Sequence, residues 1–312
     1  MVNVGQHLLG IESLTKEQIV HYLDTAESFI EINERSIKKV PTLRGKTIIN
    51  LFLEPSTRTR TSFEIAGKRL SADTINISAS ASSITKGETL IDTVLTIQAM
   101  NPDLIVMRHA FSGAPWLLAR ELPEVKIINA GDGLHEHPSQ ALLDALTMRR
   151  RLGTLENLTV TFVGDALRGR VARSNIFLLR NFGCKLRIVA PPAIAVDEFK
   201  AMGVEIYYNL AEALKGSDVV MSLRMKNEYL KDFFVPDLGE YSEHYCITSK
   251  LIKENCPDAL ILAPGPYIRG VEISSDVIDG VKSAYAEQVT MGVAVRMAIM
   301  YLLCAGTLEE SN

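Results

Sequence analysis

Residues 47–64 read TIINLFLEPSTRTRTSFE, and the character of the chain changes halfway along this stretch. The apolar run at 47–53 has the length and the β-branched content of a buried strand. Hydroxyl and arginine side chains dominate the residues that follow, which lead into a helix pattern at 59–71. A strand, a sharp loop and a helix in this order predict one unit of a parallel α/β sheet, with the loop at the edge where such sheets bind ligands.

The loop after this strand has the composition of an anion site. The first turn of a helix leaves backbone N–H groups without partners, and the helix macrodipole favours negative charge there. Ser56, Thr57 and Thr59 add hydroxyl donors, and Arg58 adds a planar guanidinium that suits phosphate oxygens. The glycines and lysine of a Walker loop are missing. We therefore predict a phosphate site, although a helix cap followed by surface arginines would use the same residue types.

The rest of the chain alternates short β-rich runs with amphipathic stretches, which is typical of βαβ units. Strands are expected at 46–53, 74–77, 103–107, 125–128, 158–163, 185–190, 204–207, 218–222 and 259–263. Helices are expected near 13–35, 59–71, 88–100, 137–152, 170–182, 210–216, 249–255 and 287–304. The 312 residues are enough for two domains, and two sheets of four or five strands suit this pattern better than one.

The composition narrows the class of function. The net charge of −4 argues against nucleic acid as the main partner, because nucleic-acid sites need a strongly basic face. The four cysteines are scattered without a CxxC pair, which argues against a disulfide framework or a zinc site. The first residues lack a signal-peptide pattern, so a cytoplasmic location is expected. The apolar stretch at 287–304 contains an arginine and predicts a buried helix rather than a membrane anchor.

Two further patches of the first half add cationic side chains. The segment 80–93 (SASSITKGETLIDT) offers Ser82, Ser83 and Lys86 ahead of a helix, although an ordinary surface loop would have the same composition. Arg108 follows a buried strand and is therefore expected at the ligand edge of a parallel sheet. A salt bridge to a neighbouring helix would explain Arg108 equally well.

The segment 129–147 (NAGDGLHEHPSQALLDALT) combines two glycines with two histidines before a helix. His137 directly precedes the helix and could donate a hydrogen bond to a carbonyl or phosphate oxygen, while Gln140, one turn later, could bind an amide. His135, Glu136 and His137 raise the question of a metal site. We expect none, because no third ligand follows at helical spacing and the pattern is not HExxH.

The second half of the chain has cationic points of its own after predicted strands. Arg170 opens a helix in VGDALRGRVARSN, which lacks the GxGxxG pattern of a dinucleotide loop. Arg224 and Lys226 follow another strand, where surface salt bridges are the alternative explanation for the arginines. The prolines of LAPGPYIRG, at 262–270, predict a rigid turn whose carbonyls can face a ligand and in which a cis bond can occur.

The two halves carry complementary side chains. The first collects groups suited to phosphate, the second collects arginines suited to carboxylates, and a histidine and a glutamine stand at the junction. No activated serine, catalytic cysteine or pair of catalytic carboxylates stands out. We therefore expect a site that aligns two anionic substrates and stabilises developing charge without covalent catalysis.

These motifs resemble, nearly end to end, the transcarbamylase family and in particular aspartate carbamoyltransferase catalytic chains. The resemblance rests on EPSTRTRTSFE, KGETLIDT, MRH, AGDGLHEHPSQALLD, VGD…GRVARS, GPYIRGVEI and EQVTMGVAVRMA. It implies two α/β domains, each a mainly parallel sheet flanked by helices, with the C-terminal helix crossing back to the first domain. The implied carbamoyl-phosphate-binding domain covers 1–135 plus 286–312, and the aspartate-binding domain covers 136–285.

The resemblance also implies a reaction, in which carbamoyl phosphate and L-aspartate give N-carbamoyl-L-aspartate and phosphate in pyrimidine biosynthesis. The implied catalytic groups are Arg58, Lys86, Arg108 and His137. The implied carbamoyl phosphate contacts are Ser56, Thr57, Arg58, Thr59, Arg108, His137, Gln140, Pro264, Gly265 and Pro266. The implied aspartate contacts are Lys86, Arg170, Arg224, Lys226 and Gly265. No metal or organic cofactor is implied, and the departing phosphate could take the proton of the attacking amine.

Ser83 and Lys86 match residues that the family donates across a subunit interface, so the resemblance implies a homotrimer with shared active sites. Whether regulatory chains or a dihydroorotase join that trimer is left open.

Three positions depart from the family pattern. Lys226 stands where the family usually has glutamine, Ala263 where it usually has histidine, and Ile268 where related bacterial chains often have asparagine. A transcarbamylase with an altered amino-acid substrate and a catalytically silent phosphate-binding subunit therefore stay open as alternatives. Ornithine is disfavoured as the acceptor, because its cationic side chain needs an acidic pocket whereas Arg224 and Lys226 are cationic. A Rossmann oxidoreductase is disfavoured because its glycine pattern is absent.

Overall fold

The computed structural model describes residues 2–78, 87–225 and 237–305. The chain divides into two compact units, one of Met1–Leu142 with Thr290–Asn312 and one of Leu143–Val289. The two divisions fall within helices α5 (Pro138–Leu152) and α11 (Tyr285–Ala305). The functional domains expected at 1–135 with 286–312 and at 136–285 stay a prediction.

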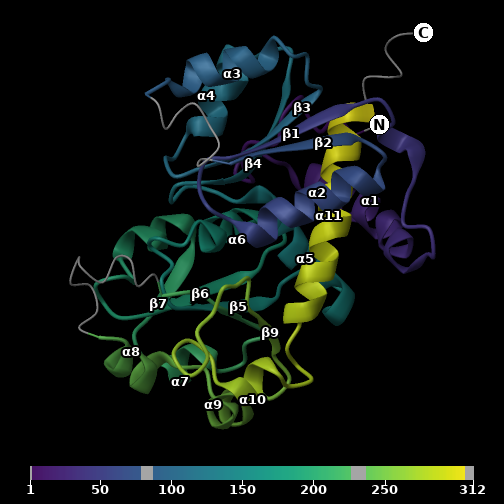
Figure 1. The fold of residues 1–312 in the computed structure, drawn as a ribbon. Coiled ribbons are helices and arrows are strands. Elements are labelled where there is room, and N and C mark those ends of the chain that lie inside the picture. The colour runs from purple at the N-terminus through teal and green to yellow at the C-terminus, as the bar shows by residue number, and fades with distance from the viewer. Residues whose placement is uncertain (1, 79–86, 226–236, 306–312) are drawn as a thin grey trace. The chain divides into compact units, whose positions relative to one another are not determined.

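The first unit is built on a four-stranded parallel sheet (Figure 1). Phe52, at the end of one central strand, lies opposite Ser78 on one side and Arg108 on the other. The order of the strands reverses between β1 and β3, so the carboxyl ends of these two strands form the switch point where such sheets bind ligands. The strands, in the order β2-β1-β3-β4, are β1 (Thr47–Phe52), β2 (Asp73–Ser78), β3 (Leu104–His109) and β4 (Lys126–Asp132).

Helices cover both faces of this sheet. On one face, Ile97 of α3 and Leu118 of α4 pack in one apolar cluster with side chains of β1 and β3. On the other face, Gly67 of α2 lies so close to β2 that a methyl group there would approach the Thr74 hydroxyl to 2.6 Å. The helices of this unit include α1 (Lys16–Glu34), η1 (Pro41–Leu43), α2 (Thr57–Arg69), α3 (Leu90–Gln98) and α4 (Ala114–Glu121).

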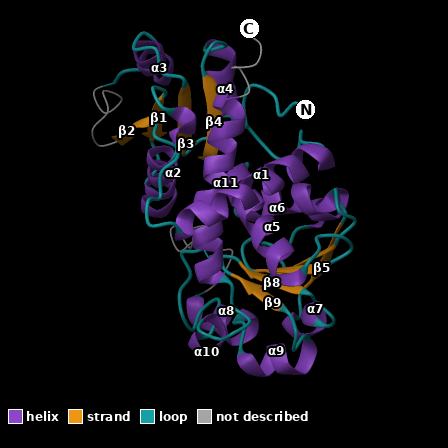
Figure 2. Ribbon diagram, turned by 90° about the vertical axis from the view of Figure 1, so that its right-hand side faces the viewer, coloured by secondary structure: helices purple, strands orange, loops and turns teal. Residues whose placement is uncertain are grey.

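The second unit is built on a five-stranded parallel sheet with helices on both faces (Figure 2). Its strand order, β7-β6-β5-β8-β9, reverses between β5 and β8. This second switch point lies at the carboxyl ends of β5 and β8. The strands are β5 (Thr159–Val163), β6 (Lys185–Val189), β7 (Val204–Tyr207), β8 (Val219–Ser222) and β9 (Leu260–Leu262).

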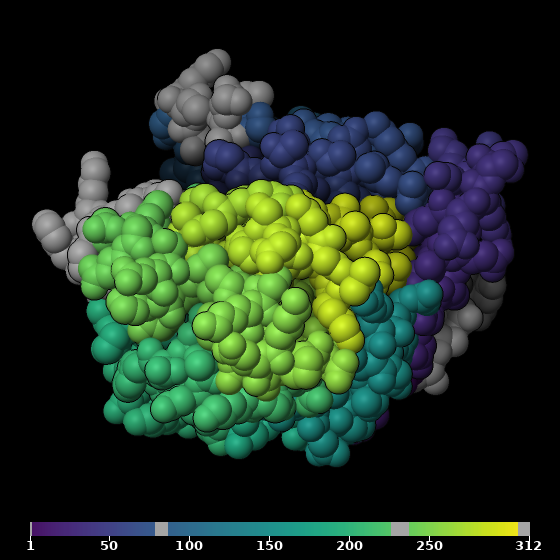
Figure 3. All heavy atoms as spheres, turned by 90° about the horizontal axis from the view of Figure 1, so that it is seen from below, coloured from purple at the N-terminus to yellow at the C-terminus, as the bar shows by residue number. Residues whose placement is uncertain are grey.

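Short helices connect the strands of the second unit. Figure 3 shows the face of this unit that carries α8, α9 and α10. Helices α7, α8 and α9 each begin with a backbone N–H that donates to the side chain of the N-cap residue, with Asn209, Asp237 and Thr248 as the caps. The helices are α6 (Arg170–Arg180), η4 (Asp197–Met202), α7 (Leu210–Leu214), α8 (Leu238–Tyr245), α9 (Ser249–Asn255) and α10 (Ser275–Ile278).

The expected parallel α/β architecture with sheets of four and five strands is confirmed. Helices α4, α8 and α10 were not expected, because they are short and lack a long apolar repeat. The first helix begins at Lys16 rather than near residue 13, since Thr15 is the N-cap. Gln18, rather than Glu17, completes its capping box.

Helix α11 is the one helix in the described ranges that is long and apolar enough to cross a membrane. Within an 18-residue stretch of Tyr285–Cys304, 67% of the residues are buried inside the structure. Arg296, within this helix, is buried, donates to the Ser62 hydroxyl at 2.9 Å and lies over the Phe63 ring. These contacts with α2 are those of a core helix, as the sequence predicted.

Candidate active site

The loop between β1 and α2 places four predicted phosphate ligands at the start of a helix. Ser56 is the N-cap residue of α2, and its hydroxyl makes no capping hydrogen bond. Thr57 and Arg58 are exposed, whereas Thr59 is buried. The first turn of α2 has no acidic side chain, so the positive end of the helix dipole and the Arg58 guanidinium both favour an anion here.

Arg108, at the end of β3, lies beside this loop. Leu53 donates its backbone N–H to the Arg108 carbonyl at 2.9 Å, which joins the ends of β1 and β3. The buried Arg108 guanidinium donates from Nη2 to Glu54 Oε1 at 2.9 Å and from Nη1 to the Ala130 carbonyl at 3.2 Å. The ion pair that the sequence left open as an alternative therefore exists, but its partner is on the loop between β1 and α2 rather than on a neighbouring helix.

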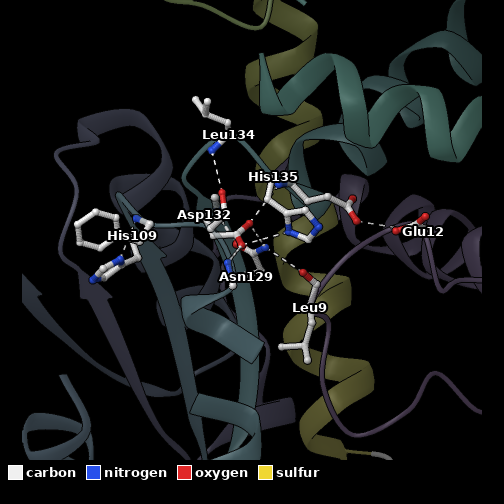
Figure 4. A network of polar contacts seen from close by, with 12 residues as sticks. Leu9, Glu12, His109, Asn129, Asp132, Leu134 and His135 are labelled. Carbon is white, nitrogen blue, oxygen red and sulfur yellow. Dashed lines mark hydrogen bonds and ion pairs between the residues drawn. The ribbon is translucent and has the colours of Figure 1, made fainter. Parts of the chain in front are cut away.

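Asp132 organises the loop between β4 and α5 (Figure 4). Its buried carboxylate accepts hydrogen bonds from Gly113 N at 2.7 Å, Asn129 Nδ2 at 2.8 Å and Glu136 N at 3.1 Å, and contacts His135 Nδ1 at 3.2 Å. Burial raises the pKa of Asp132, but the hydrogen bonds from His135, Gly113, Asn129 and Glu136 outweigh burial and hold the pKa below its usual 3.8. Asp132 is therefore an anion that fixes a loop.

The same loop needs a glycine at position 133. Gly133 has a φ of +49°, and a Cβ atom there would lie 2.5 Å from both the backbone N and the Oγ of Ser112. Ser112 Oγ also accepts from Leu134 N at 3.2 Å. The turn at Gly133 is thus packed closely against the loop that carries Ser112.

Glu136 binds the N-terminal segment of the chain. Its buried carboxylate accepts from Ile11 N at 2.8 Å, and a Cβ at Gly10 would lie 2.4 Å from its Oε1. Its neighbour His135 contacts Asp132 instead. Across the ranges that the structure describes, no group of three or more His, Cys, Asp or Glu side chains could hold a metal ion.

His137 and Gln140 begin α5 at the same edge of the first sheet. Both side chains are buried. The His137 carbonyl accepts from Gln140 N at 2.9 Å and from Ala141 N at 3.3 Å, so His137 occupies the last position before the helix. The first unit thus brings together the loop at 56–59, Arg108, His137 and Gln140 along the carboxyl ends of β1, β3 and β4.

Arg170 and Arg224 follow the two strands that flank the switch point of the second sheet. Arg170 is the first residue of α6 after β5 and is buried, and Arg224 follows β8 and is half-buried. Leu223 N donates to the Val163 carbonyl at 2.8 Å, which joins the two loops. A Cβ at Gly164 would lie only 2.7 Å from the Leu223 carbonyl oxygen, so this close approach requires glycine.

A buried ion pair shapes the loop that leads to Arg170. Asp165 accepts from Arg168 Nε at 2.7 Å and from Arg168 N at 3.1 Å, and both residues are buried. The loop is therefore closed by its own charged side chains rather than by the glycine pattern of a dinucleotide site.

The third loop of the second sheet is the turn at Pro264, Gly265 and Pro266. The Gly265–Pro266 bond is cis, as the sequence allowed. Glu272, which is buried, accepts from Ile268 N just after this turn and from Met225 N at 3.0 Å. Burial raises the pKa of Glu272, and hydrogen bonds from the Ile268 and Met225 amides and the charge of Arg224 partly offset the rise.

Three of the predicted site residues, Ser83, Lys86 and Lys226, lie outside the described residues. For the others, the structure gives two sets, one on each sheet, and their roles as ligands stay predictions.

Two family models cover most of the chain. Residues 6–150 match the aspartate/ornithine carbamoyltransferase carbamoyl-phosphate-binding domain, and residues 156–303 match the aspartate/ornithine-binding domain. The chain belongs to the aspartate/ornithine carbamoyltransferase family. The first model contains the sites on the first sheet, and the second contains Arg170, Arg224 and the turn at 264–266.

Individual members of the carbamoyltransferase family are similar over almost the whole chain. The aspartate carbamoyltransferase catalytic subunit of Syntrophus aciditrophicus is 56% identical over 296 residues, covering 95% of this chain and 96% of its own. The Trypanosoma cruzi aspartate transcarbamoylase, solved with carbamoyl phosphate and aspartate, has a TM-score of 0.85 at 30% identity over 96% of this chain and 97% of its own. The ornithine carbamoyltransferase of Pyrococcus furiosus has a TM-score of 0.87 at 26% identity over 98% and 99%.

The acidic side chains that hold the site loops of this carbamoyltransferase family member were not predicted from the sequence. Glu54, Asp132 and Glu272 each accept hydrogen bonds within or between loops that carry predicted ligands. Glu54 and Asp132 lie within motifs that were noticed for their cations and histidines. A carboxylate surrounded by donor side chains was a usable signal for Glu54 and Asp132. For Glu272, the partner Met225 lies 47 residues away and could not be inferred from the sequence.

Proposed function

We propose that the chain transfers the carbamoyl group of carbamoyl phosphate to the amino group of L-aspartate, giving N-carbamoyl-L-aspartate and phosphate. The observation that carries this proposal is the pair Arg170 and Arg224 at the switch point of the second sheet. Guanidinium groups suit carboxylates, and aspartate has two of them. Relatives that are more than half identical to this chain carry the aspartate carbamoyltransferase name, which supports the same acceptor.

Carbamoyl phosphate binds to the groups on the first sheet. The amide and hydroxyl donors at 56–59 and the Arg58 guanidinium hold the phosphate oxygens. Arg108, fixed by Glu54 and the Ala130 carbonyl, reaches the phosphate and the carbamoyl carbonyl. His137 donates to the carbonyl oxygen, where negative charge grows as the amine attacks. Gln140 binds near the carbamoyl amine.

Aspartate binds to the groups on the second sheet. Arg170 and Arg224 hold its carboxylates, and Lys226 is proposed to assist them. The carbonyls of the turn at 264–266 accept from the carbamoyl amine. Lys86 contributes to the same reaction as a further cation.

The reaction needs no covalent intermediate on the protein. The neutral amine of aspartate forms the new C–N bond at the carbamoyl carbon, and the C–O bond to phosphate breaks. The amine proton leaves with the phosphate, which serves as the base. The residues on both sheets therefore act by alignment and by stabilising charge.

A transcarbamylase with a different amino-acid acceptor is the second candidate. Lys226 is the observation that favours it, because an ammonium group in place of an amide changes the charge around the acceptor. Ala263 and Ile268 leave the turn without the side chains that the family pattern has there. A catalytically silent phosphate-binding subunit is the remaining alternative to the enzyme.

The assembly, the location and the place in metabolism also belong to this proposal. Ser83 and Lys86 support a homotrimer in which each chain lends residues to its neighbour's site. We place the enzyme in the cytoplasm and in pyrimidine biosynthesis, with regulatory chains or a dihydroorotase as further partners to be tested. Analytical ultracentrifugation of the purified chain tests the trimer directly, and a monomer at micromolar concentration would contradict it.

The enzyme proposal is tested by initial rates of the purified chain with carbamoyl phosphate and L-aspartate. We expect phosphate and N-carbamoyl-L-aspartate to form in equal amounts, with no burst of phosphate ahead of the carbamoylated product. Binding of carbamoyl phosphate without any turnover would instead support the silent subunit.

A further inference from the structure

A chain of buried polar groups leads from α5 and α6 to the start of the 264–266 turn. Asn175 Nδ2 donates to Asp144 Oδ2 at 2.9 Å, and Gln288 Nε2 donates to Asp144 Oδ1 at 2.8 Å. Gln288 Oε1 then accepts from Ala263 N at 2.9 Å. Asp144 and Asn175 are fully buried and Gln288 is 3% exposed. Four segments that are far apart in sequence are thus joined by three hydrogen bonds.

The backbone brings Gln288 to this place. Ile261 of β9 forms a parallel bridge with Ser283, and Ala284 N donates to the Ile261 carbonyl at 2.9 Å. Gln288 N in turn donates to the Ala284 carbonyl at 2.8 Å, so Gln288 lies one turn into α11. The first turn of α11 is therefore fixed beside the end of β9, where Ala263 follows.

The orientation of the Gln288 amide is determined by its partners. An ionised carboxylate only accepts hydrogen bonds, so the NH₂ group of Gln288 must face Asp144. Its oxygen then faces the Ala263 amide, which is itself buried and needs an acceptor. Asp144 thus fixes which end of Gln288 meets the turn.

The turn is held at its other end as well. Ile268 N donates to the buried carboxylate of Glu272. The Tyr267 ring packs edge-to-face on Tyr285 of α11, with 5.1 Å between the ring centroids. Between these anchors, the carbonyls of Pro264, Gly265 and Pro266 have little freedom to move.

We infer that Gln288, oriented by Asp144, is a positioning residue that sets the 264–266 turn for the reacting carbamoyl and amine groups. The inference rests on the proposed function, because it is the turn's carbonyls that contact the reacting groups there. Gln288 acts on the turn through the Ala263 amide and touches no substrate. At Ala263 only the backbone is available for this support, since the side chain is a methyl group.

The matched test uses Gln288→Glu and Asp144→Asn, singly and together. In Gln288→Glu two carboxylates face each other, so they share a proton at low pH and repel at high pH. When the two carboxyl groups share a proton, the group at position 288 still accepts a hydrogen bond from Ala263 N. When both are ionised, their repulsion disrupts this hydrogen bond. In the double variant, the new amide at position 144 donates to the new carboxylate at position 288, and the oxygen of that amide accepts from Asn175. The three hydrogen bonds that join Asn175, position 144, position 288 and Ala263 are then restored, with the charge moved from position 144 to position 288.

We expect kcat/KM for aspartate of Gln288→Glu, relative to the unmutated chain, to fall by about 100-fold as the pH rises from 6 to 9. At pH 9 the double variant should have a kcat/KM for aspartate at least about tenfold above that of Gln288→Glu, and it should lose this pH dependence. Asp144→Asn alone should not give this gain. Glu287→Gln is the control, because Glu287 precedes Gln288 and pairs with Arg151 at 2.7 Å at the surface. Its pH profile should match that of the unmutated chain.

Amide hydrogen exchange gives a readout that does not depend on activity. Gln288→Ala should raise exchange in peptides covering 260–268 while leaving those of β5 and β6 protected. Uniformly raised exchange, or a Gln288→Glu profile parallel to that of the unmutated chain, would overturn the positioning role alone. No turnover by the unmutated chain would overturn the proposed function and the positioning role together.

Discussion

Glu54 Oε1 accepts a hydrogen bond from Arg108 Nη2 at 2.9 Å at the carboxyl edge of the first sheet. The carboxylate belongs to the loop between β1 and α2 and the guanidinium belongs to the neighbouring strand β3, so the pair fixes the two loops that flank the switch point. The Ala130 carbonyl holds the other side of the guanidinium. The remaining N–H groups of Arg108 have a defined direction as a result.

Glu54→Ala should therefore lower kcat/KM for carbamoyl phosphate by about tenfold, because Arg108 loses a partner that orients it. Glu54→Gln keeps an oxygen acceptor and should lose less. Steady-state kinetics on both variants checks the order. Glu31→Ala is the control, since Glu31 pairs with Arg35 on the surface of α1 and its replacement should have almost no effect. Equal losses in the three variants would contradict the orienting role.

Arg58→Ala should reduce kcat by about 100-fold or more, because the donor to the departing phosphate is lost where charge develops. Arg58 is exposed, so the variant should unfold at the same temperature as the unmutated chain. Turnover assays together with thermal unfolding separate the two effects. Retained turnover would remove the phosphate-loop assignment.

Mixing Arg58→Ala and Lys86→Ala chains should restore part of the activity that each lacks alone. If the two residues of one site come from different chains of a trimer, some sites in a mixed trimer are free of both substitutions. The measurement is turnover after joint refolding or subunit exchange. If the rate of the mixture is only the sum of the rates of the two separate variants, each site is built by a single chain.

Asp132→Asn should lower the free energy of unfolding by about 1–3 kcal/mol at pH 7, because an NH₂ group would face one of the donors that now meet the carboxylate. The folded pKa of Asp132 lies below its usual 3.8, so its contribution is present above that value and is lost as pH falls through the lower pKa. The difference between the two proteins should shrink below pH 3.8. Urea titrations from pH 3 to 7 measure it.

Asp258→Asn is the control for that titration, because Asp258 pairs with Lys282 at the surface. A pH-independent difference at position 132 would show that the loss comes from packing rather than from the carboxylate charge.

Most of the fold could be predicted because the pattern is local. The apolar run and the hydroxyl-rich loop of 47–64 were sufficient to predict β1, the loop and α2. The alternation along the chain predicted each of the nine strands that the described residues form. Helix α4 was missed because it has eight residues and begins after Gly113 in a left-handed conformation. Its apolar side chains repeat too few times to produce a helical signal.

The placement of candidate residues at the ends of strands and helices could be predicted where a motif carries them, as at Arg58, Arg108 and His137, and their roles as ligands stay predictions. The support that comes from distant sequence could not be predicted. Gln288 meets the Ala263 amide across 25 residues and Asp144 across 144. Such pairs depend on how β9 and α11 align, and a single sequence carries no trace of that alignment.

The most direct test of the account supplies the purified chain with carbamoyl phosphate and equal concentrations of L-aspartate and L-ornithine, and quantifies both carbamoylated products by mass spectrometry. Arg170 and Arg224 at the second switch point predict N-carbamoyl-L-aspartate in large excess, and Arg224→Ala should lower its yield without raising that of citrulline. Citrulline as the main product, or carbamoylation of neither amino acid, would contradict the assignment of the second sheet to an acidic acceptor.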